Sequence, residues 1–347
     1  MIDPGARLTV AVTGPTGEIG GPFVRALDRS DAVGRIVGMA RRPFDPHASG
    51  LRKVEYLQGD ILDRTSVQKL VDGADVVVHL AFLIFDDSDQ ARSTNLEGAR
   101  NVFEESFAAG TSRLVYASSV AAYGFHKDNP DLITEEVEAR GSANHYYSQQ
   151  KADVEQLLAN LARSADTDVF VFRPCIVAGP DATALIDRIP YVRLSQRLPD
   201  AVVGLAEKLP LLRPVIPDPG VPIQLVHHDD VAGALVAAVL GQGAPGAYNL
   251  AGDGRITLSD LAHALGWYAV PLPAVAVKAT ATIISKMPYL PAETSWINAV
   301  RVPVLVDSTK AKNEFGWKPL HNAFETLAST VAAARARGTL PWPGGIA

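Results

Sequence analysis

The chain has 347 residues, of which 47% are hydrophobic and 20% charged, with a formal net charge of -6. This composition excludes a largely disordered chain, and it argues against nucleic acid as the principal partner because neutralising phosphates requires clustered Lys and Arg. The one cysteine, Cys175, excludes an internal disulfide and a cysteine-rich metal site and fits the reducing cytoplasm. The first residues lack the pattern of a secretion signal, and no stretch reaches the roughly 20 apolar residues of a membrane helix. We therefore expect a soluble, cytoplasmic protein without a membrane partner.

Short apolar runs alternate with helix-length amphipathic segments through the first half of the chain. This alternation is typical of a parallel sheet covered by helices on both faces, and continuous apolar runs suit strands that are buried on both sides. The predicted strands are Leu8–Thr13, Arg35–Ala40, Val54–Gly59, Asp75–Ala81, Arg113–Ser118 and Asp168–Arg173. The predicted helices are Glu18–Arg29, Thr65–Val71, Asp89–Ala109 and Ser142–Ala162. The fold class is thus α/β, with a doubly wound parallel sheet.

The regular alternation ends near Asp181, where repeated prolines interrupt an apolar stretch. It resumes with a helix from Asp229 to Leu240 and a strand at Ala247–Ala251, and Thr257 or Ser259 then caps a further helix. We expect one domain over residues 1–180, to which residues 223–251 return. Residues 181–222 and 252–347 are expected to form a smaller substrate-binding lobe.

A glycine-rich turn, Thr13–Gly20, joins the first strand to the first helix. Glycines let the backbone turn sharply and approach a pyrophosphate, whose charge is stabilised by the free N–H groups at the start of the helix. The position of the turn in the first strand–helix unit favours dinucleotide binding over a turn with no ligand. The predicted cofactor contacts in this turn are Gly14, Thr16, Gly17, Glu18, Ile19 and Gly20.

The second strand ends at Arg41 and Arg42, where an NAD-binding chain usually carries an acid for the ribose hydroxyls. Arginine can instead pair with a ribose 2′-phosphate, so we expect NADP, with NAD as the other candidate cofactor. A solvated pair at a strand end is the alternative interpretation of these arginines. Further cofactor contacts are predicted for Asp60, Ile61, Leu80, Ala81, Pro174 and Ile176.

Tyr147 and Lys151 are four residues apart in a predicted helix and therefore share a face. A nearby ammonium favours the phenolate and brings the tyrosine pKa toward neutrality, which would make Tyr147 an acid/base. Such pairs also arise by chance on helices. The preceding strand ends at Ser118 and Ser119, where a hydroxyl would face the ligand. We select Ser119 as the substrate ligand and expect Ser118 to cap or fill the turn.

Together these motifs resemble those of the extended short-chain dehydrogenases/reductases, also described as the NAD-dependent epimerase/dehydratase family. The resemblance covers nearly the whole chain and implies a Rossmann-type fold, an NAD(P)-dependent oxidoreductase and a homodimer. It also implies that Tyr147 is the acid/base, that Lys151 holds the nicotinamide ribose and lowers the tyrosine pKa, and that Ser119 binds the carbonyl. Further matching segments are Asn95–Val102, Val115–Gly124, Arg173-Pro174, Gly179-Pro180, Val226–Ala232, Tyr248–Leu250 and Phe315–Pro319.

The expected substrate is a small molecule with a carbonyl or secondary alcohol group. Family members that act on nucleotide sugars usually carry an asparagine after the Arg-Pro strand end and an arginine before the His-x-x-Asp segment; this chain has neither, although Arg188 or Arg213 could substitute. Apolar residues of the lobe suit a less polar ketone or alcohol, although they could equally be core. These are Leu211, Leu212, Val215, Ile216, Val221, Ile283, Ile284 and Trp296.

Two other functions compete with this one. A nucleotide-sugar epimerase or dehydratase would use a tightly bound NAD(P), and a non-catalytic regulator would only bind the dinucleotide. Metal chemistry is disfavoured, because His227-His228-Asp229-Asp230 fits a helix start with acids near its positive end.

Overall fold

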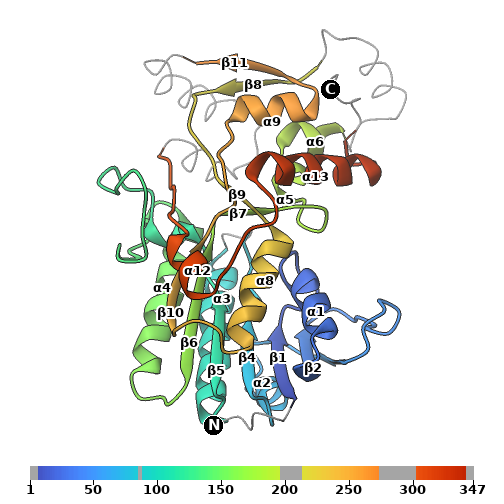
Figure 1. Ribbon diagram of the computed structural model, residues 1–347, viewed down its shortest axis with the longest axis vertical. Helices are drawn as coiled ribbons and strands as arrows, with labels where there is room; N and C mark the ends of the chain where they lie inside the picture. Colours follow the sequence, from blue (N-terminus) through green and yellow to red (C-terminus); the bar gives the residue numbers. More distant parts are fainter. Residues whose placement is uncertain (1–6, 85–87, 196–212, 273–301, 341–347) are drawn as a thin grey trace.

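The computed structural model describes residues 7–84, 88–195, 213–272 and 302–340. Its centre is a seven-stranded sheet in the order β10-β6-β5-β4-β1-β2-β3, in which every neighbouring pair is parallel. The sheet occupies the lower part of the molecule in Figure 1, and a smaller lobe lies above it. The strands are β1 (Leu8–Thr13), β2 (Val33–Ala40), β3 (Val54–Gln58), β4 (Val76–His79), β5 (Arg113–Ala117), β6 (Asp168–Pro174) and β10 (Gly246–Leu250).

Helices cover both faces of the sheet because successive strand residues point to opposite sides. Val76 and Val78 pack on the side of α1 (Gly20–Arg29) and α8 (His228–Val239). Val77 packs on the other side, against α2 (Arg64–Val71), α3 (Asp89–Ala108) and α4 (Tyr146–Ala162). The predicted doubly wound α/β fold is confirmed.

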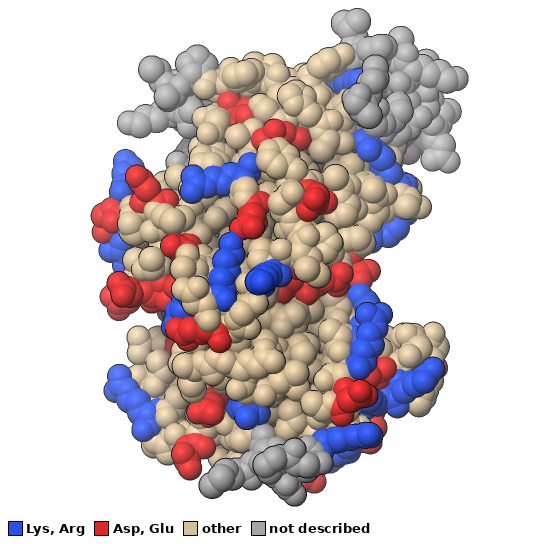
Figure 2. All heavy atoms as spheres, in the orientation of Figure 1, with Lys and Arg blue, Asp and Glu red and all other residues tan. Residues whose placement is uncertain are grey.

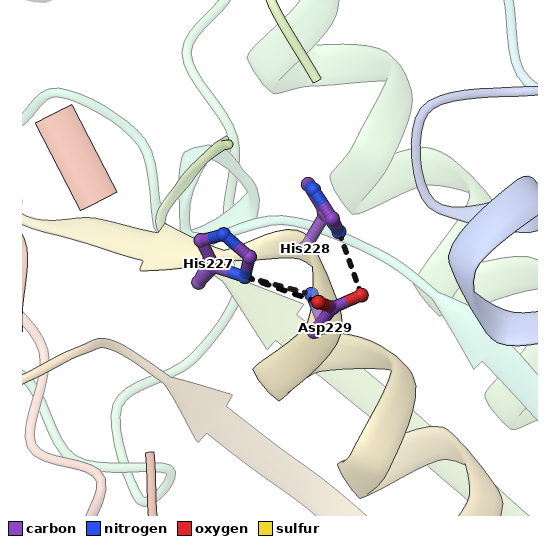
Figure 3. Close-up of side chains that lie close together, drawn as sticks. All are labelled: His227, His228 and Asp229. Atoms are coloured by element: carbon purple, nitrogen blue, oxygen red, sulfur yellow. Dashed lines mark hydrogen bonds and ion pairs between the residues drawn. The ribbon is translucent and has the colours of Figure 1, made fainter. Parts of the chain in front are cut away.

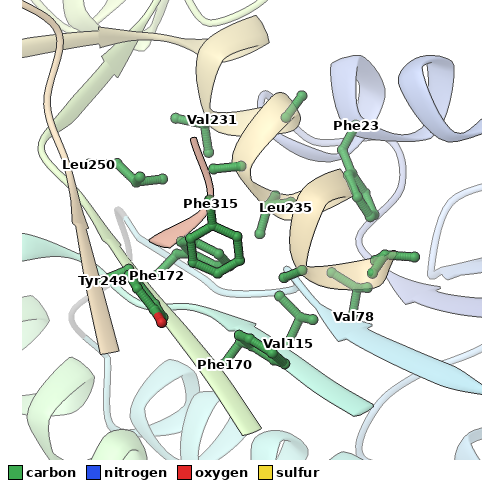
Figure 4. Packing of buried hydrophobic residues seen from close by; sticks show 14 of the residues in the cluster. Phe23, Val78, Val115, Phe170, Phe172, Val231, Leu235, Tyr248, Leu250 and Phe315 are labelled. Atoms are coloured by element: carbon green, nitrogen blue, oxygen red, sulfur yellow. The ribbon is translucent and has the colours of Figure 1, made fainter. Parts of the chain in front are cut away.

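The core beside α8 is completed by residues from late in the chain (Figure 4). Phe315 directly follows α12 (Thr309–Glu314), and its ring lies 4.5 Å from that of Tyr248 and 5.6 Å from that of Phe172 between centroids. The Trp317 indole donates to the Asp230 carbonyl oxygen at 2.8 Å. Although the sequence suggested that residues 252–347 belong to the lobe, α12 packs on the sheet, because these aromatic side chains fill the gap between α8 and β10.

The smaller lobe has its own apolar cluster, in which Leu261, Trp267 and Leu327 are buried together. It is built from a parallel pair of strands and several helices (Figure 1). Its elements are α5 (Ala184–Asp187), α6 (Pro190–Ser195), β8 (Val215–Asp218), α9 (Leu258–Leu265), β11 (Tyr268–Pro271) and α13 (Ala323–Ala336). Two short strands, β7 (Ile176–Ala178) and β9 (Leu225–His227), pair in parallel between the lobe and the sheet.

Helix ends differ from the sequence expectation where side chains cap them. Helix α4 was expected to begin at Ser142 but begins at Tyr146, because the His145 side chain accepts a hydrogen bond from the Ser148 N–H at 3.2 Å. Helix α9 is capped by Thr257, one of the two predicted caps.

Among the described residues, no helix is both long and apolar enough to cross a membrane.

On the face drawn in Figure 2, basic and acidic side chains are interspersed over both the sheet domain and the lobe. This face therefore lacks the concentrated positive charge that would hold a polyanion.

Candidate active site

The carboxyl ends of β1 and β4 lie side by side at the point where the strand order reverses. Ligands of open parallel sheets bind at this point. Gly14 has a φ of 72°, which glycine adopts without strain, and a side chain there would come within 3.0 Å of the Ala81 nitrogen. A Cβ on Gly20 would lie 2.0 Å from the Gly14 carbonyl oxygen, whereas one on Gly17 would make only an ordinary 3.5 Å contact with that oxygen. The fold therefore requires glycine at positions 14 and 20, but not at 17.

The start of α1 is suited to a phosphate group. Its N-cap residue is Ile19, which makes no side-chain hydrogen bond to the first turn, and that turn contains no acidic residue. The N–H groups and the positive end of the helix dipole are thus not neutralised by a side chain of the cap. A glycine cradle joined to such a helix end fits the pyrophosphate of a dinucleotide, and the exposed Thr16 and Gly17 lie at the rim of the turn.

Glu18, a predicted cofactor contact, directs its carboxylate elsewhere. Its Oε1 accepts a hydrogen bond from the Ala184 N–H at 3.0 Å, at the start of α5. Arg25 of α1 forms an ion pair with Asp181 in the loop before α5. Side chains of the glycine turn and of α1 therefore contact the segment that leads into the lobe.

The residues after β2 and β3 form the outer end of the site. The side chains of Arg41 and Arg42 are exposed, and within the part of the chain that the structure describes neither forms an ion pair. Their backbone is fixed, because Gln58 Nε2 donates to the Arg41 carbonyl oxygen at 3.0 Å and the Tyr56 hydroxyl to that of Arg42. This arrangement leaves two guanidinium groups available to a ligand at the end of β2.

Asp60 and Ile61 follow β3 and are held by local contacts. Asp60 Oδ1 accepts a hydrogen bond from the Leu62 N–H at 3.0 Å. Ile61 packs so tightly on α3 that a Cβ on Gly98 would lie 2.3 Å from its Cδ1 atom. The second carboxylate oxygen of Asp60 and the accessible part of Ile61 remain for the predicted cofactor contact.

Hydrogen bonds of the Thr13 side chain connect the end of β1 to the end of β4. Its Oγ1 accepts hydrogen bonds from the Leu80 and Ala81 N–H groups at 3.1 and 3.2 Å, so its own proton is donated to Nδ1 of His79, 2.8 Å away. His79 is therefore neutral with its proton on Nε2, and burial lowers its pKa to about 3. These bonds hold Leu80 and Ala81 beside Gly14.

Ser119 and Tyr147 meet at the inner end of the site. Ser119 follows β5, and its hydroxyl lies close enough to that of Tyr147, near the start of α4, to act on the tyrosine pKa. Ser119 Oγ also accepts from the Ala121 N–H at 3.1 Å and so caps the short helix η1 (Val120–Tyr123). The turn is therefore capped by Ser119, and not by Ser118 as the sequence suggested, because Ser118 donates its proton to Glu155 at 2.5 Å.

Lys151 lies beside this pair, buried with 3% of its surface exposed. Its Nζ donates to the Ala117 carbonyl oxygen at 2.8 Å and to the Tyr116 hydroxyl at 3.2 Å. The ring centroid of Phe82 is 3.8 Å from the ammonium and that of Tyr147 is 5.9 Å from it. The three predicted catalytic side chains thus come together at the ends of β4 and β5.

The pKa values at this inner end are governed by burial. Burial lowers the pKa of Lys151 to about 7, against the opposing effect of the Glu155 carboxylate. Burial raises the pKa of Tyr147, and the nearby Ser119 hydroxyl opposes the rise. The sequence suggested that Lys151 lowers the pKa of Tyr147. In the structure the pKa of Tyr147 is raised instead, and the Lys151 ammonium donates its hydrogen bonds to Ala117 and Tyr116 of β5.

Pro174 is the last residue of β6, and Ile176 is the first residue of β7. Pro174 is buried, while Ile176 is 42% exposed and is paired with Leu225. Cys175 between them is buried, and its N–H donates to the Leu250 carbonyl oxygen at 2.9 Å. Only Ile176 of these three presents much surface to a ligand.

Gln224 lies in the segment before His227 in which the sequence offers no arginine, and its side chain is used structurally. Its amide forms two hydrogen bonds with the backbone of Val306, at 2.8 and 3.1 Å. Of the two predicted substitutes, Arg188 follows α5 and Arg213 precedes β8, which lies at the far end of the lobe in Figure 1. Among the predicted apolar substrate contacts, Val215 and Ile216 are in β8 and Val221 follows it. The remaining five, Leu211, Leu212, Ile283, Ile284 and Trp296, lie outside the described residues.

His227, His228 and Asp229 form a compact cluster at the start of α8 (Figure 3), with ligand-type atoms all within 4.8 Å of one another. His227 Nδ1 accepts from the Asp229 N–H at 3.2 Å, and His228 Nδ1 lies 3.0 Å from Asp229 Oδ1. Burial and the adjacent imidazoles lower the pKa of His227 to about 4. The cluster acts as the helix cap that the sequence indicated, and the positive helix end opposes a bound cation.

Three residues at the inner end were not predicted from the sequence: Phe82, Tyr116 and Glu155. Glu155 follows Lys151 by four residues, and this spacing on a helix could have indicated a shared face. The contacts of Phe82 and Tyr116 depend on how β4 and β5 meet α4, which no local pattern specifies.

Comparison with known proteins identifies the family. The sequence model described as the NAD dependent epimerase/dehydratase family matches residues 10–251. The chain is 26% identical over 335 residues to protein y4nG of Sinorhizobium fredii, covering 93% of this chain and 77% of the relative. It is 28% identical over 184 residues to cinnamoyl-CoA reductase 1 of Petunia hybrida, covering 49% and 55% of the two chains. It spans 32% of the length of a longer relative from Mycobacterium tuberculosis, Rv2047c, at 26% identity.

A solved structure shares the fold over nearly its whole length. MoeE5, in complex with UDP-glucuronic acid and NAD, superposes with a TM-score of 0.69 at 19% identity, covering 95% of this chain and 99% of that chain. The family-model match over residues 10–251 contains the glycine turn, the three grouped side chains of the inner end and the strand β10 that completes the sheet. The chain belongs to the NAD-dependent epimerase/dehydratase family, and it is an NAD(P)-dependent enzyme of the extended short-chain dehydrogenase/reductase type.

Proposed function

We propose that the protein transfers hydride between NADP(H) and a small molecule with a carbonyl or secondary alcohol group, with Tyr147 as the acid/base. The observation that carries this proposal is the grouping of the Ser119 and Tyr147 side chains beside the buried ammonium of Lys151. When bound, the nicotinamide supplies or accepts the hydride. The protein residues supply binding, orientation and the proton.

The proposed cofactor position follows from groups that fit each part of a dinucleotide. Gly14, Gly17 and the start of α1 would hold the pyrophosphate, and Ala81 would lie along the cofactor toward the inner end. Lys151 would hold the nicotinamide ribose. The exposed guanidinium groups of Arg41 and Arg42, which pair with no described residue, support NADP over NAD, because a forked donor suits a phosphate.

The chemical role of each catalytic side chain follows from its protonation state. With its raised pKa, Tyr147 is protonated at neutral pH, so it can donate its proton to a carbonyl oxygen as reduction proceeds. The Ser119 hydroxyl lies near that of Tyr147 and would orient the same oxygen. A positively charged Lys151 would then stabilise the resulting phenolate.

The substrate is proposed to be a less polar ketone, aldehyde or alcohol. Cys175 is buried and Gln224 is committed to Val306, so neither offers a group to a sugar nucleotide. The Petunia relative is named as a reductase of a thioester substrate, which agrees with a redox role. MoeE5 binds a nucleotide sugar, so epimerisation is the competing outcome of the test.

The test is net oxidation of NADPH by a panel of aromatic and aliphatic ketones and aldehydes, followed by absorbance at the nicotinamide band. Reductase activity that is lost in Tyr147→Phe and retained in Tyr146→Phe is the expected result. Tyr146 is a matched control because it is the adjacent tyrosine of the same helix and its hydroxyl donates to the Ile84 carbonyl oxygen. Conversion of UDP-sugars without net NADPH turnover would replace the proposal with epimerisation.

A further inference from the structure

The Lys151 ammonium is enclosed by three protein groups. It donates to the Ala117 carbonyl oxygen at 2.8 Å and to the Tyr116 hydroxyl at 3.2 Å, both from β5. An ammonium has three donors, and the ring of Phe82, which follows β4, covers it with a centroid 3.8 Å from Nζ. A nicotinamide ribose can therefore bind Lys151 only when one of these three groups gives way.

Of the three groups, Phe82 is the one that can move aside. Tyr116 is 1% exposed, and its ring packs against those of His79 and Phe103, each at 5.7 Å between centroids. Ala117 belongs to β5, which is paired with a strand on either side. The side chain of Phe82 is only half-buried. A ribose hydroxyl is thus expected to approach Lys151 from the side of Phe82, and not through the sheet.

The backbone on either side of Phe82 is fixed by side-chain hydrogen bonds. Before it, the Ala81 N–H donates to Thr13 Oγ1 at 3.2 Å. After it, the buried Asn95 side chain binds both backbone groups of Leu83: its Oδ1 accepts from the N–H at 2.8 Å, and its Nδ2 donates to the carbonyl oxygen at 3.0 Å. The Phe82 ring can therefore leave the ammonium by rotation about its own side-chain bonds, while the segment stays in place.

Two contacts hold the Phe82 ring over the ammonium. The face of an aromatic ring carries a negative potential that attracts a cation, and water does little to weaken this attraction because Lys151 is 3% exposed. The ring also meets that of Tyr147 at 5.7 Å between centroids and an angle of 82°, the favourable edge-to-face arrangement. A ribose bound to Lys151 must replace both contacts.

We propose that Phe82 competes with the nicotinamide ribose for Lys151, and that rotation of the Phe82 side chain is a step of cofactor binding. The inference rests on the proposed function, from which it takes the contact between Lys151 and the ribose. Uncovering Lys151 costs free energy and therefore lowers the affinity for the whole dinucleotide. The adenine half of the cofactor is assigned to the outer end of the site, so its binding leaves Phe82 in place.

The first test compares cofactor affinities of the full-length protein by isothermal titration calorimetry. Phe82→Ala should bind NADP about tenfold more tightly than wild type, because the covered conformation no longer reduces the apparent affinity. Phe82→Leu, which fills much of the same space without an aromatic face, should show a smaller gain. Adenosine 2′,5′-bisphosphate carries the adenine half of the cofactor and no nicotinamide ribose, so all three proteins should bind it equally well.

The matched control is Phe107→Ala. Like Phe82, Phe107 is partly buried and packs against the apolar cluster between the sheet and α3. It lies in the last turn of α3, shortly before β5 begins, and so at the opposite edge of the sheet from the site. Its affinity for NADP should equal that of wild type. The proposal is overturned if both Phe82 variants bind NADP no more tightly than wild type, or if Phe107→Ala or the bisphosphate shows the same gain.

The position of the ring is followed directly by NMR. The ring current of Phe82 shifts the εCH₂ protons of Lys151 upfield, and in protein labelled with [ε-¹³C]lysine this signal is assigned by its loss in Lys151→Arg. NADP should move the signal of wild type downfield, toward its position in Phe82→Leu, and the bisphosphate should leave it unmoved. A signal that stays upfield in the NADP complex would contradict the proposal.

The outcomes separate this inference from the proposed function. A ring displaced by NADP in a protein that reduces no carbonyl compound would refute the proposed function alone. Carbonyl reduction with the Lys151 signal unmoved by NADP would refute the role of Phe82 alone. A wild-type protein that binds neither NADP nor NAD would overturn both.

Discussion

The two ends of the site differ in how their polar side chains are held. At the inner end, Ser119, Tyr147 and Lys151 are packed among strands and helices: Ser119 and Lys151 form hydrogen bonds with the backbone, and the Tyr147 ring packs on Phe82. At the outer end, Arg41 and Arg42 are exposed, and no described residue pairs with them. The protein itself therefore sets the protonation states of the inner end, whereas a ligand must organise the outer end. Mutations should accordingly affect chemistry at one end and cofactor choice at the other.

The strongest test of this contrast is Tyr147→Phe at the inner end. Loss of the proton donor should reduce kcat by about 10²–10⁴-fold, the contribution of a positioned acid/base. The dissociation constant for NADPH, measured by fluorescence, should change little, because the ring and its packing on Phe82 are retained. A matching loss of NADPH binding would show that the two ends are not separable.

The glycine turn lies between the two ends and offers a matched pair of variants. Gly20→Ala should lower the free energy of unfolding by about 3 kcal/mol, because its Cβ would lie 2.0 Å from the Gly14 carbonyl oxygen. Gly17→Ala should leave that free energy nearly unchanged in urea unfolding and weaken NADPH binding instead, because its Cβ meets only an ordinary contact in the protein. Equal destabilisation by both would contradict the assignment of Gly17 to the ligand.

At the outer end, Arg41→Ala and Arg42→Ala should weaken the use of NADPH but not that of NADH. Loss of a charged hydrogen bond to the 2′-phosphate should raise the KM for NADPH about tenfold and leave that for NADH unchanged. Differential scanning fluorimetry of wild type should show greater stabilisation by NADP than by NAD. Equal stabilisation would remove the preference for NADP.

The smallest expected effect is a pH dependence of stability at the inner end. The pKa of His79 is about 3 in the folded protein and about 6.5 when the chain is unfolded, so the unfolded state takes up a proton first as pH falls. This contribution to stability is complete above pH 6.5 and is lost progressively below it, by up to about 1.4 kcal/mol per pH unit. Urea unfolding at pH 7 and pH 5.5 should show a shallower pH dependence in His79→Asn than in wild type.

The sequence predicted those parts of the site that depend on local geometry. The glycine turn requires particular backbone conformations, and Tyr147 and Lys151 share a face because of helical spacing, so both were recognisable from their patterns. The division of roles between Ser118 and Ser119 was not, because it depends on Glu155 reaching across from α4. Likewise, the partners of Lys151 come from β5, which is distant in the sequence.

The boundaries of the smaller lobe likewise depend on contacts between residues that are distant in the sequence, so local patterns did not predict them. Prolines marked where the regular alternation stops, but they could not indicate that Phe315 returns to the sheet to pack on Tyr248. The aromatic residues that fill this gap follow no strand or helix period, so only tertiary packing assigns them to the sheet domain.

The position of β10 far along the sequence from its neighbour β6 has a consequence for biosynthesis. Strand β6 is translated well before its outer neighbour, Gly246–Leu250, so a nascent or truncated chain ending near residue 180 presents a bare strand edge that can pair with another chain. A fragment containing only the N-terminal strands is thus expected to self-associate. Any attempt to express the dinucleotide-binding half by itself should extend through residue 251.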